Sequence, residues 1–167
     1  IRGVPFAGFS DTQALRYANQ ATFHPLKYLC GLAAGIRARG SALYADTIVE
    51  NVEETDGGVR VSTVSGLTVS AKSAVVATNS PINDRVALHT KQAPYRTYAM
   101  SFEIARDTLP DALYWDTEDP YHYVRLQPGE GRTDFLIVGG EDHKTGQADD
   151  AGDRFAALIA WTRRLVP

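Results

Sequence analysis

Residues 121–140 read YHYVRLQPGEGRTDFLIVGG, and this stretch decides the fold. It contains two segments of strand type, Tyr121–Leu126 and Asp134–Gly139, which are rich in aromatic and β-branched residues. Pro128-Gly129-Glu130-Gly131 stands between them, and these residue types favour a turn. The stretch therefore predicts two strands that run antiparallel to each other.

The sequence before this stretch extends the sheet. Arg96–Ile104 and Ala112–Trp115 also have strand character. They are separated from each other by Pro110-Asp111 and from the next strand by Glu118-Asp119-Pro120, and both sequences favour turns. We therefore predict a four-stranded antiparallel sheet.

A helix follows the sheet. Asp149 or Asp150 is suited to cap its amino terminus. Apolar residues and one threonine then recur at helical spacing and define a single face, namely Phe155, Leu158, Ile159, Thr162 and Leu165.

Residues 47–77 have a period of two, which is typical of strands. Asp56-Gly57-Gly58 and Ser65-Gly66 divide them as tight turns, so a three-stranded meander is expected. The meander leads into the apolar run Ser73–Ala77, which predicts a strand buried on both faces. Residues 80–93, with several turn-forming residues, are expected to be a connection.

The clearest helix in the sequence begins at Pro25, because proline is tolerated at a first helical position. It ends at Gly40, a residue typical of helix ends. Its single apolar face includes Cys30, which we expect to be buried. We also predict a short strand at 42–45 and two short extended segments within residues 1–23. The predicted class is thus α+β, with an antiparallel or mixed sheet, helices and a meander.

Composition excludes several classes of protein. The 167 residues carry a net charge of −3 without a basic stripe, which argues against nucleic-acid binding. No apolar run is long enough to span a membrane. A single cysteine allows no internal disulfide, which suggests a cytoplasmic protein. The first residue is Ile1 and the sole methionine is Met100, so we expect an interior piece of a larger protein.

Familiar catalytic signatures are missing. The sequence has no GxGxxG fingerprint, P-loop, GxSxG elbow or HExxH motif. Its four histidines are scattered, so a hydrolase with a dispersed Ser–His–Asp triad is left as a weak alternative. The consecutive Glu141, Asp142 and His143 are poorly placed to converge on one ion, and we predict no metal site.

His24-Pro25 stands at the predicted helix start and Gly40 near its end, Thr47-Ile48-Val49 enters the predicted meander, and Val75–Ser80 returns from it. In these features, residues 24–81 resemble the second half of the FAD-binding domain in the D-amino-acid-oxidase-like family, which includes glycine and sarcosine oxidases. The resemblance implies that Val49, Ala77, Thr78 and Asn79 contact FAD. The sequence departs from the family at Asn79-Ser80, where glycine is frequent. The fingerprint helix that holds the pyrophosphate is not in this sequence, so this chain alone is not expected to bind FAD.

The later sequence resembles the substrate domain of the same family. Residues 136–147 look most similar to bacterial members that carry an additional Rieske domain, although this chain has no cluster ligands. The resemblance implies a division into residues 24–80, part of the FAD-binding domain, and residues 1–23 with 81–167, the substrate domain.

The family resemblance also implies a reaction. It is hydride transfer to flavin from the carbon beside the nitrogen of an amine or amino acid, and no side chain of this chain need act as acid or base. A guanidinium suits a substrate carboxylate. Arg125, or less favourably Arg96, is the expected anchor, and Tyr121 and Tyr123 would wall the site.

A second interpretation is a non-catalytic binding module whose sheet resembles a substrate domain. A concave face lined by tyrosine and arginine would favour the enzyme, and an exposed sheet without a pocket would favour the module. On the enzyme reading, the partners are the substrate and the missing Rossmann part of the same protein. Self-association through exposed apolar surface is also expected.

Overall fold

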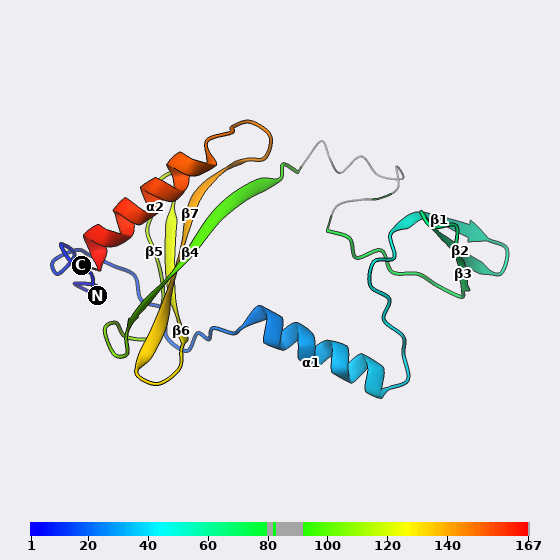
Figure 1. The fold of residues 1–167 in the computed structure, drawn as a ribbon, viewed down its shortest axis with the longest axis horizontal. Helices are drawn as coiled ribbons and strands as arrows, with labels where there is room; N and C mark the ends of the chain where they lie inside the picture. The colour runs from blue at the N-terminus through cyan, green and yellow to red at the C-terminus, as the bar shows by residue number, and fades with distance from the viewer. Residues whose placement is uncertain (80–81, 83–91, 167) are drawn as a thin grey trace. The chain divides into compact units, whose positions relative to one another are not determined.

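The computed structural model describes residues 1–79, 82 and 92–166 of the chain. The chain divides into two compact units, residues 1–22 with 94–167 and residues 23–93. The first contains a sheet and a helix, and the second contains a helix and a meander (Figure 1). The α+β class is confirmed, and what each unit binds stays a prediction.

The sheet of the first unit has four strands in the order β4-β7-β6-β5. They are β4 (Tyr95–Ala105), β7 (Thr133–Lys144), β6 (His122–Pro128) and β5 (Leu113–Trp115). All neighbours pair antiparallel, and the four predicted strands are confirmed. The pairing of β6 with β7 has no register shift and runs from His122 opposite Gly140 to Pro128 opposite Asp134.

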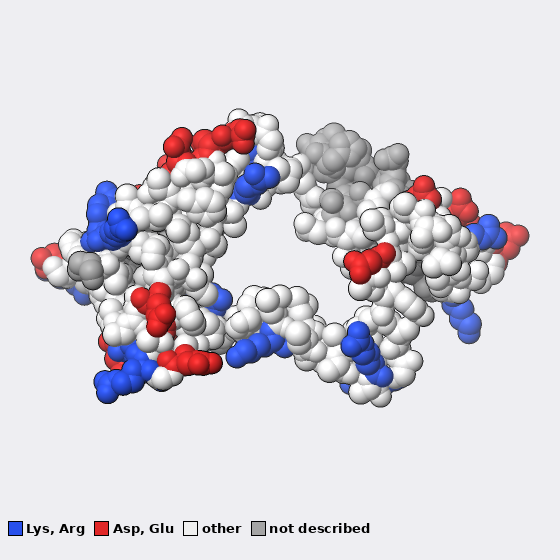
Figure 2. Space-filling view, in the orientation of Figure 1, with Lys and Arg blue, Asp and Glu red and all other residues white. Residues whose placement is uncertain are grey.

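Helix α2 (Ala151–Leu165) packs across one face of this sheet and confirms the predicted last helix (Figure 1). Leu158 and Leu165 of α2 are buried. The buried core residues are Tyr98, Leu109, Val124, Leu126, Leu136, Val138 and Leu158. Acidic side chains gather over the start of α2 and basic ones over its end, as the helix dipole favours (Figure 2).

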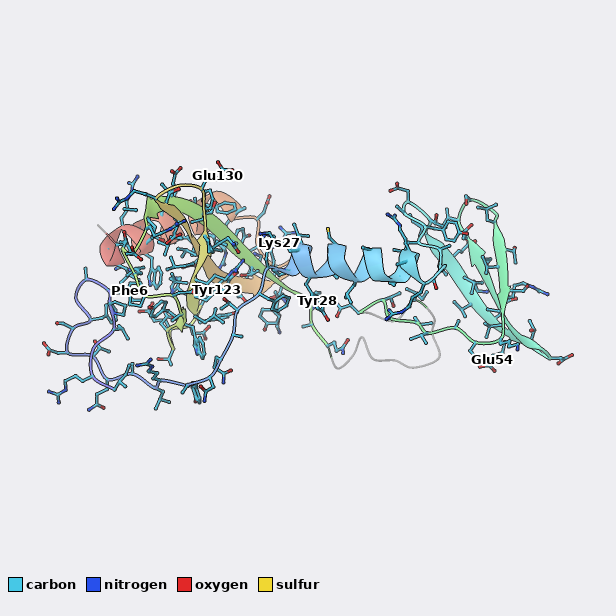
Figure 3. All side chains as sticks on the ribbon, turned by 90° about the horizontal axis from the view of Figure 1, so that it is seen from below. Phe6, Lys27, Tyr28, Glu54, Tyr123 and Glu130 are labelled. Atoms are coloured by element: carbon cyan, nitrogen blue, oxygen red, sulfur yellow. The ribbon has the colours of Figure 1, made fainter. Side chains whose placement is uncertain are left out.

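The amino-terminal segment lies against this core without becoming a strand. Arg2 and Gln13 form an isolated bridge, turns replace the first predicted extended segment, and the second has no strand pairing. Phe6, labelled in Figure 3, meets Tyr114 edge-on with ring centroids 4.9 Å apart. Two turns between the bridged residues bring this ring to the sheet, and an extended chain would not.

The second unit contains the predicted meander. Its strands are β1 (Val49–Thr55), β2 (Gly58–Thr63) and β3 (Thr68–Ala71), in that order and antiparallel. Gly58 has φ +147°, and a side chain there would meet the carbonyl oxygen of Ala71. The Asp56-Gly57-Gly58 turn therefore requires glycine at its last position.

Helix α1 (Pro25–Ala38) also forms as predicted. The His24 side chain accepts a hydrogen bond from the backbone N–H of Lys27 at 3.4 Å, and Gly40 has a left-handed φ of +79° after the helix. Among the described residues, α1 packs against no other helix or strand. Cys30 is therefore exposed, and its predicted burial is wrong.

Two predicted strands of the second unit are wrong. Residues 42–45 and 73–77 have no strand pairing, and Val75 is 91% exposed. A strand needs a neighbour for its backbone N–H and C=O groups, and the described residues offer none to these segments. Of the predicted connection 80–93, residues 80–81 and 83–91 lie outside the described residues. No helix within the described ranges is long and apolar enough to cross a membrane.

Candidate functional site

The four-stranded sheet has one face packed by α2 and one face that α2 leaves open. Along β6, His122, Val124 and Leu126 are buried, while Tyr123 and Arg125, which alternate with them, are partly exposed. Because successive side chains of a strand point to opposite faces, Tyr123 and Arg125 belong to the open face. Figure 3 labels Tyr123 on this sheet. We refer to this surface, lined by Leu113, Trp115, Tyr121, Tyr123, Arg125, Phe135, Ile137 and Gly139, as the open face.

Tyr123 lies flat across the neighbouring strand. It stands opposite Gly139 in the β6–β7 register. A Cβ atom added to Gly139 would lie 2.2 Å from Cζ and from Oη of Tyr123, so the phenol end of the ring covers this glycine. The ring of Tyr121 lies 6.3 Å from that of Tyr123 at a 35° tilt. The structure therefore brings together the two tyrosines predicted to wall the site.

Arg125 stands between two apolar neighbours on the same face. Its cross-strand partners are Leu113 on β5 and Ile137 on β7. The side chain is partly buried, and no described residue forms a hydrogen bond or ion pair with its guanidinium. The group thus retains all five donors for another partner.

Arg96 lies on the opposite side of the sheet. It pairs with His143, and directly opposed residues of an antiparallel pair share a face. Nε2 of His143 lies 3.0 Å from the hydroxyl of Tyr98, which is buried and meets Phe155 of α2 edge-on. Arg96 is therefore on the α2 side and is not brought together with Arg125.

Asp142 acts on the open face beside Tyr121. The pKa of the Tyr121 phenol is raised by burial and, secondarily, by the charge of Asp142. Oδ1 of Asp142 is buried and makes no hydrogen bond with any residue that the structure describes. The left-handed backbone at Glu141, φ +56°, and the shift in the β4–β7 register interrupt the alternation of faces after Gly140, so strand alternation does not indicate the position of Asp142.

A network of charged groups on the α2 side holds His122, which sequence reasoning did not single out. Nδ1 of the buried His122 lies 2.9 Å from Oδ2 of Asp116, and Nε2 lies 3.2 Å from Oε1 of Glu141. The imidazole stacks on Trp161 with ring centroids 4.5 Å apart. Each ring nitrogen therefore has a carboxylate placed to accept a hydrogen bond from it. The backbone carbonyl of Glu141 in turn accepts a hydrogen bond from Arg154.

Asp116, Glu118 and His122 also place three possible metal-ligand atoms within 4.8 Å of one another. Nδ1 of His122 is already paired with Asp116, and Asp116 also accepts the backbone N–H of His122 at 2.8 Å. These bonds join the start of β6 to the end of β5, so we assign the cluster a structural role.

The predicted FAD-contacting residues belong to the second unit. Val49 begins β1 and is partly buried. Ala77, Thr78 and Asn79 follow the meander in an exposed segment without strand pairing. Asn79 has φ +66°, the left-handed conformation that asparagine tolerates better than most residues and that glycine adopts freely. Asparagine thus suits the position where the family often has glycine.

These residues fit one part of an FAD site. Small side chains and a left-handed backbone at residues 77–79 allow close approach of a planar group. The chain has no glycine-rich strand–turn–helix to hold the pyrophosphate. It can therefore contribute contacts to FAD but not the phosphate-binding element.

Comparisons with known proteins place the chain among its relatives. A protein of Bacillus subtilis strain 168, named as a Rieske 2Fe-2S iron-sulfur protein, is 25% identical over 146 residues. The match covers 87% of this chain and 28% of that protein, so the chain spans about a quarter of the relative's length. No solved structure matches the chain.

The family described as FAD dependent oxidoreductase matches residues 4–167, which is nearly the whole chain. Apart from residues 1–3, both compact units lie within this match, and so does the open face. The chain belongs to the family of FAD-dependent oxidoreductases.

Proposed function

We propose that the protein containing this chain oxidises a C–N bond of an amine or amino acid, and that the open face holds the substrate. Arg125 carries the proposal. A partly buried guanidinium that has no partner among the described residues, set between Leu113 and Ile137, is suited to a carboxylate. Its planar fork can form two parallel hydrogen bonds to the carboxylate oxygens.

The aromatic residues of the open face would position the rest of the substrate. Trp115 lies opposite Tyr123 on β5 and is 60% exposed. Tyr121 precedes Tyr123 by two residues, so along the chain it lies on the side of Tyr123 away from Arg125. Such rings exclude water from the carbon to be oxidised and attract a cationic amine over their faces. Arg125 at one end and the rings beside it would fix the orientation of the substrate.

FAD, when bound to the complete protein, would supply the acceptor for the hydride. The residues of this chain would bind and orient the substrate and shield it from water, and no side chain described above is assigned as acid or base. In the second unit, Val49, Ala77, Thr78 and Asn79 would contact the cofactor through backbone and small side chains.

The first test is the visible absorption spectrum of the full-length protein, followed by turnover assays with amines and amino acids. Flavin bands and turnover are expected. A full-length protein that lacks flavin even after addition of FAD would overturn the proposal and favour the non-catalytic binding module.

The second test concerns Arg125. Arg125→Ala should raise KM for a carboxylate-bearing substrate roughly 10- to 100-fold with little change in kcat, because it removes a charge-assisted pair of hydrogen bonds. Arg96→Ala is the matched control, since Arg96 lies on the other side of the sheet, and it should leave KM unchanged. Equal KM values in both variants and the wild type would rule out the anchor.

A further inference from the structure

Gly139 and Gly140 are adjacent in β7, and each requires glycine for a different reason. Gly140 has φ +146°, a backbone conformation that disfavours other residues. Gly139 has no such φ, so its backbone would accept alanine. The contact that a side chain at Gly139 would make is with the ring of Tyr123, at 2.2 Å to Cζ and Oη and 2.7 Å to Cε1. Glycine at 139 therefore serves Tyr123 rather than the backbone.

The residues that lie beside Tyr123 on the neighbouring strands differ in size, with a large one on β5 and small ones on β7 and β4. Tyr123 pairs with Trp115 on β5 and with Gly139 on β7, and Gly139 pairs with Ala99 on β4. The Tyr123 ring extends from β6 over Gly139 and occupies the space that a side chain at residue 139 would fill. Trp115, on its other side, is not in that space.

We propose that Gly139 is a specificity-determining position of the substrate face. It acts through Tyr123, by seating the ring flat so that the space beside Arg125 stays open to substrate. This inference rests on the proposed function and adds a residue to it. Tyr123 and Arg125 are two residues apart on β6 and point to the same face, about 7 Å apart along the strand. A ring lifted off the sheet would enter the space where a substrate bound to Arg125 must lie.

The proposal predicts a dependence on substrate size. In Gly139→Ala the new methyl group displaces the Tyr123 ring, because 2.2 Å is far below van der Waals contact. We expect KM to rise about tenfold for bulky amines and less for the smallest substrate accepted, with kcat changed less than KM. A general loss of folding would instead lower the amount of active, flavin-containing enzyme without changing KM.

The test is a double-mutant cycle in the full-length flavin-containing protein. Tyr123→Ala removes the ring, so Gly139→Ala should have almost no effect on KM in the Tyr123→Ala background. Gly152→Ala is the matched control, because a Cβ atom at Gly152 meets nothing within 4 Å. Its KM should equal that of the wild type, and flavin content should be the same in all variants.

Two results would overturn the role of Gly139. One is an unchanged KM in Gly139→Ala for large and small substrates alike, in a protein whose wild type turns over amines. The other is a rise in KM that persists undiminished when Tyr123 is alanine. A wild type that oxidises no amine would instead overturn the proposed function, and the role of Gly139 with it.

Discussion

The two faces of the four-stranded sheet are built from alternate residues of the same strands, yet, among the residues that the structure describes, polar groups are paired on one face and include unpaired atoms on the other. Beneath α2, both nitrogens of the buried His122 have carboxylate partners, Asp116 and Glu141, which are themselves partly buried. On the open face, the Arg125 guanidinium has no partner among the described residues, and one oxygen of Asp142 makes no hydrogen bond. The difference separates the groups that maintain the fold from those available to a ligand.

The comparison predicts that stability depends mainly on the α2 side. Leu136→Ala, at a residue only 1% exposed, should lower the free energy of unfolding by about 2–5 kcal/mol because it leaves a cavity. Leu113→Ala makes the same chemical change on the open face, where the side chain is 44% exposed, and should cost about 1 kcal/mol. Urea unfolding of both variants measures the difference. Equal losses would show that the open face is packed as tightly as the other.

The next largest effect concerns the carboxylates around His122. Asp116→Asn should cost about 1–3 kcal/mol of unfolding free energy, because the charged acceptor at 2.9 Å from the buried Nδ1 is lost. Glu118→Gln is the control, since its side chain is 63% exposed and 3.8 Å from the same nitrogen, and it should cost about 0.5 kcal/mol or less. Thermal unfolding of the two variants decides. A larger loss for Glu118→Gln would contradict the structural role of Asp116.

Local patterns predicted much of the fold. The Pro128–Gly131 turn and the alternation on either side of it indicated β6 and β7, and Pro25 and Gly40 marked the limits of α1. Residues 73–77 misled because an apolar run predicts a buried strand only if another strand pairs with it. Cys30 misled for the same reason, since a helical face is buried only where something packs against it.

The candidate site was predictable only where strand alternation sufficed. Strand alternation alone puts Tyr121, Tyr123 and Arg125 on one face and His122 on the other, as the structure has them. It could not place Arg96, because the register of β4 against β7 shifts between Arg96 and Tyr98. The partners of His122 come from the loop before β6 and from β7, and their convergence is a tertiary property.

A smaller effect would sharpen the description of the open face. Burial and, next, the Asp142 charge raise the pKa of the Tyr121 phenol. Asp142→Asn removes this charge and the carboxylate's hydrogen bond with the phenol but leaves the effects of burial and of Tyr123, so the pKa should fall toward, without reaching, the ordinary tyrosine value. The ultraviolet absorbance of phenolate during an alkaline titration measures this, with Tyr121→Phe in the Asp142→Asn background to identify the signal. An unchanged Tyr121 titration would place Asp142 away from that ring.

The smallest expected effect concerns the loss of stability at low pH and the Asp150–Arg154 pair at the start of α2. A hydrogen bond from Arg154 to Asp150, at 3.0 Å, lowers the pKa of that carboxyl group below its ordinary value. A carboxylate with a lowered folded-state pKa stabilises the fold above its unfolded pKa, near about 4, and this contribution disappears as pH falls through the folded value.

Asp150→Asn should therefore lower Tm slightly at neutral pH and make the decline of Tm below about pH 4 less steep. Asp149→Asn, at the exposed neighbouring residue, should leave that decline as in the wild type. Salt should weaken the effect of Asp150, because the pair is at the surface. If Tm declines equally steeply below about pH 4 in Asp150→Asn and in the wild type, the ion pair between Asp150 and Arg154 does not contribute to stability. Arg154 would then stabilise α2 only through its hydrogen bond to the Glu141 carbonyl.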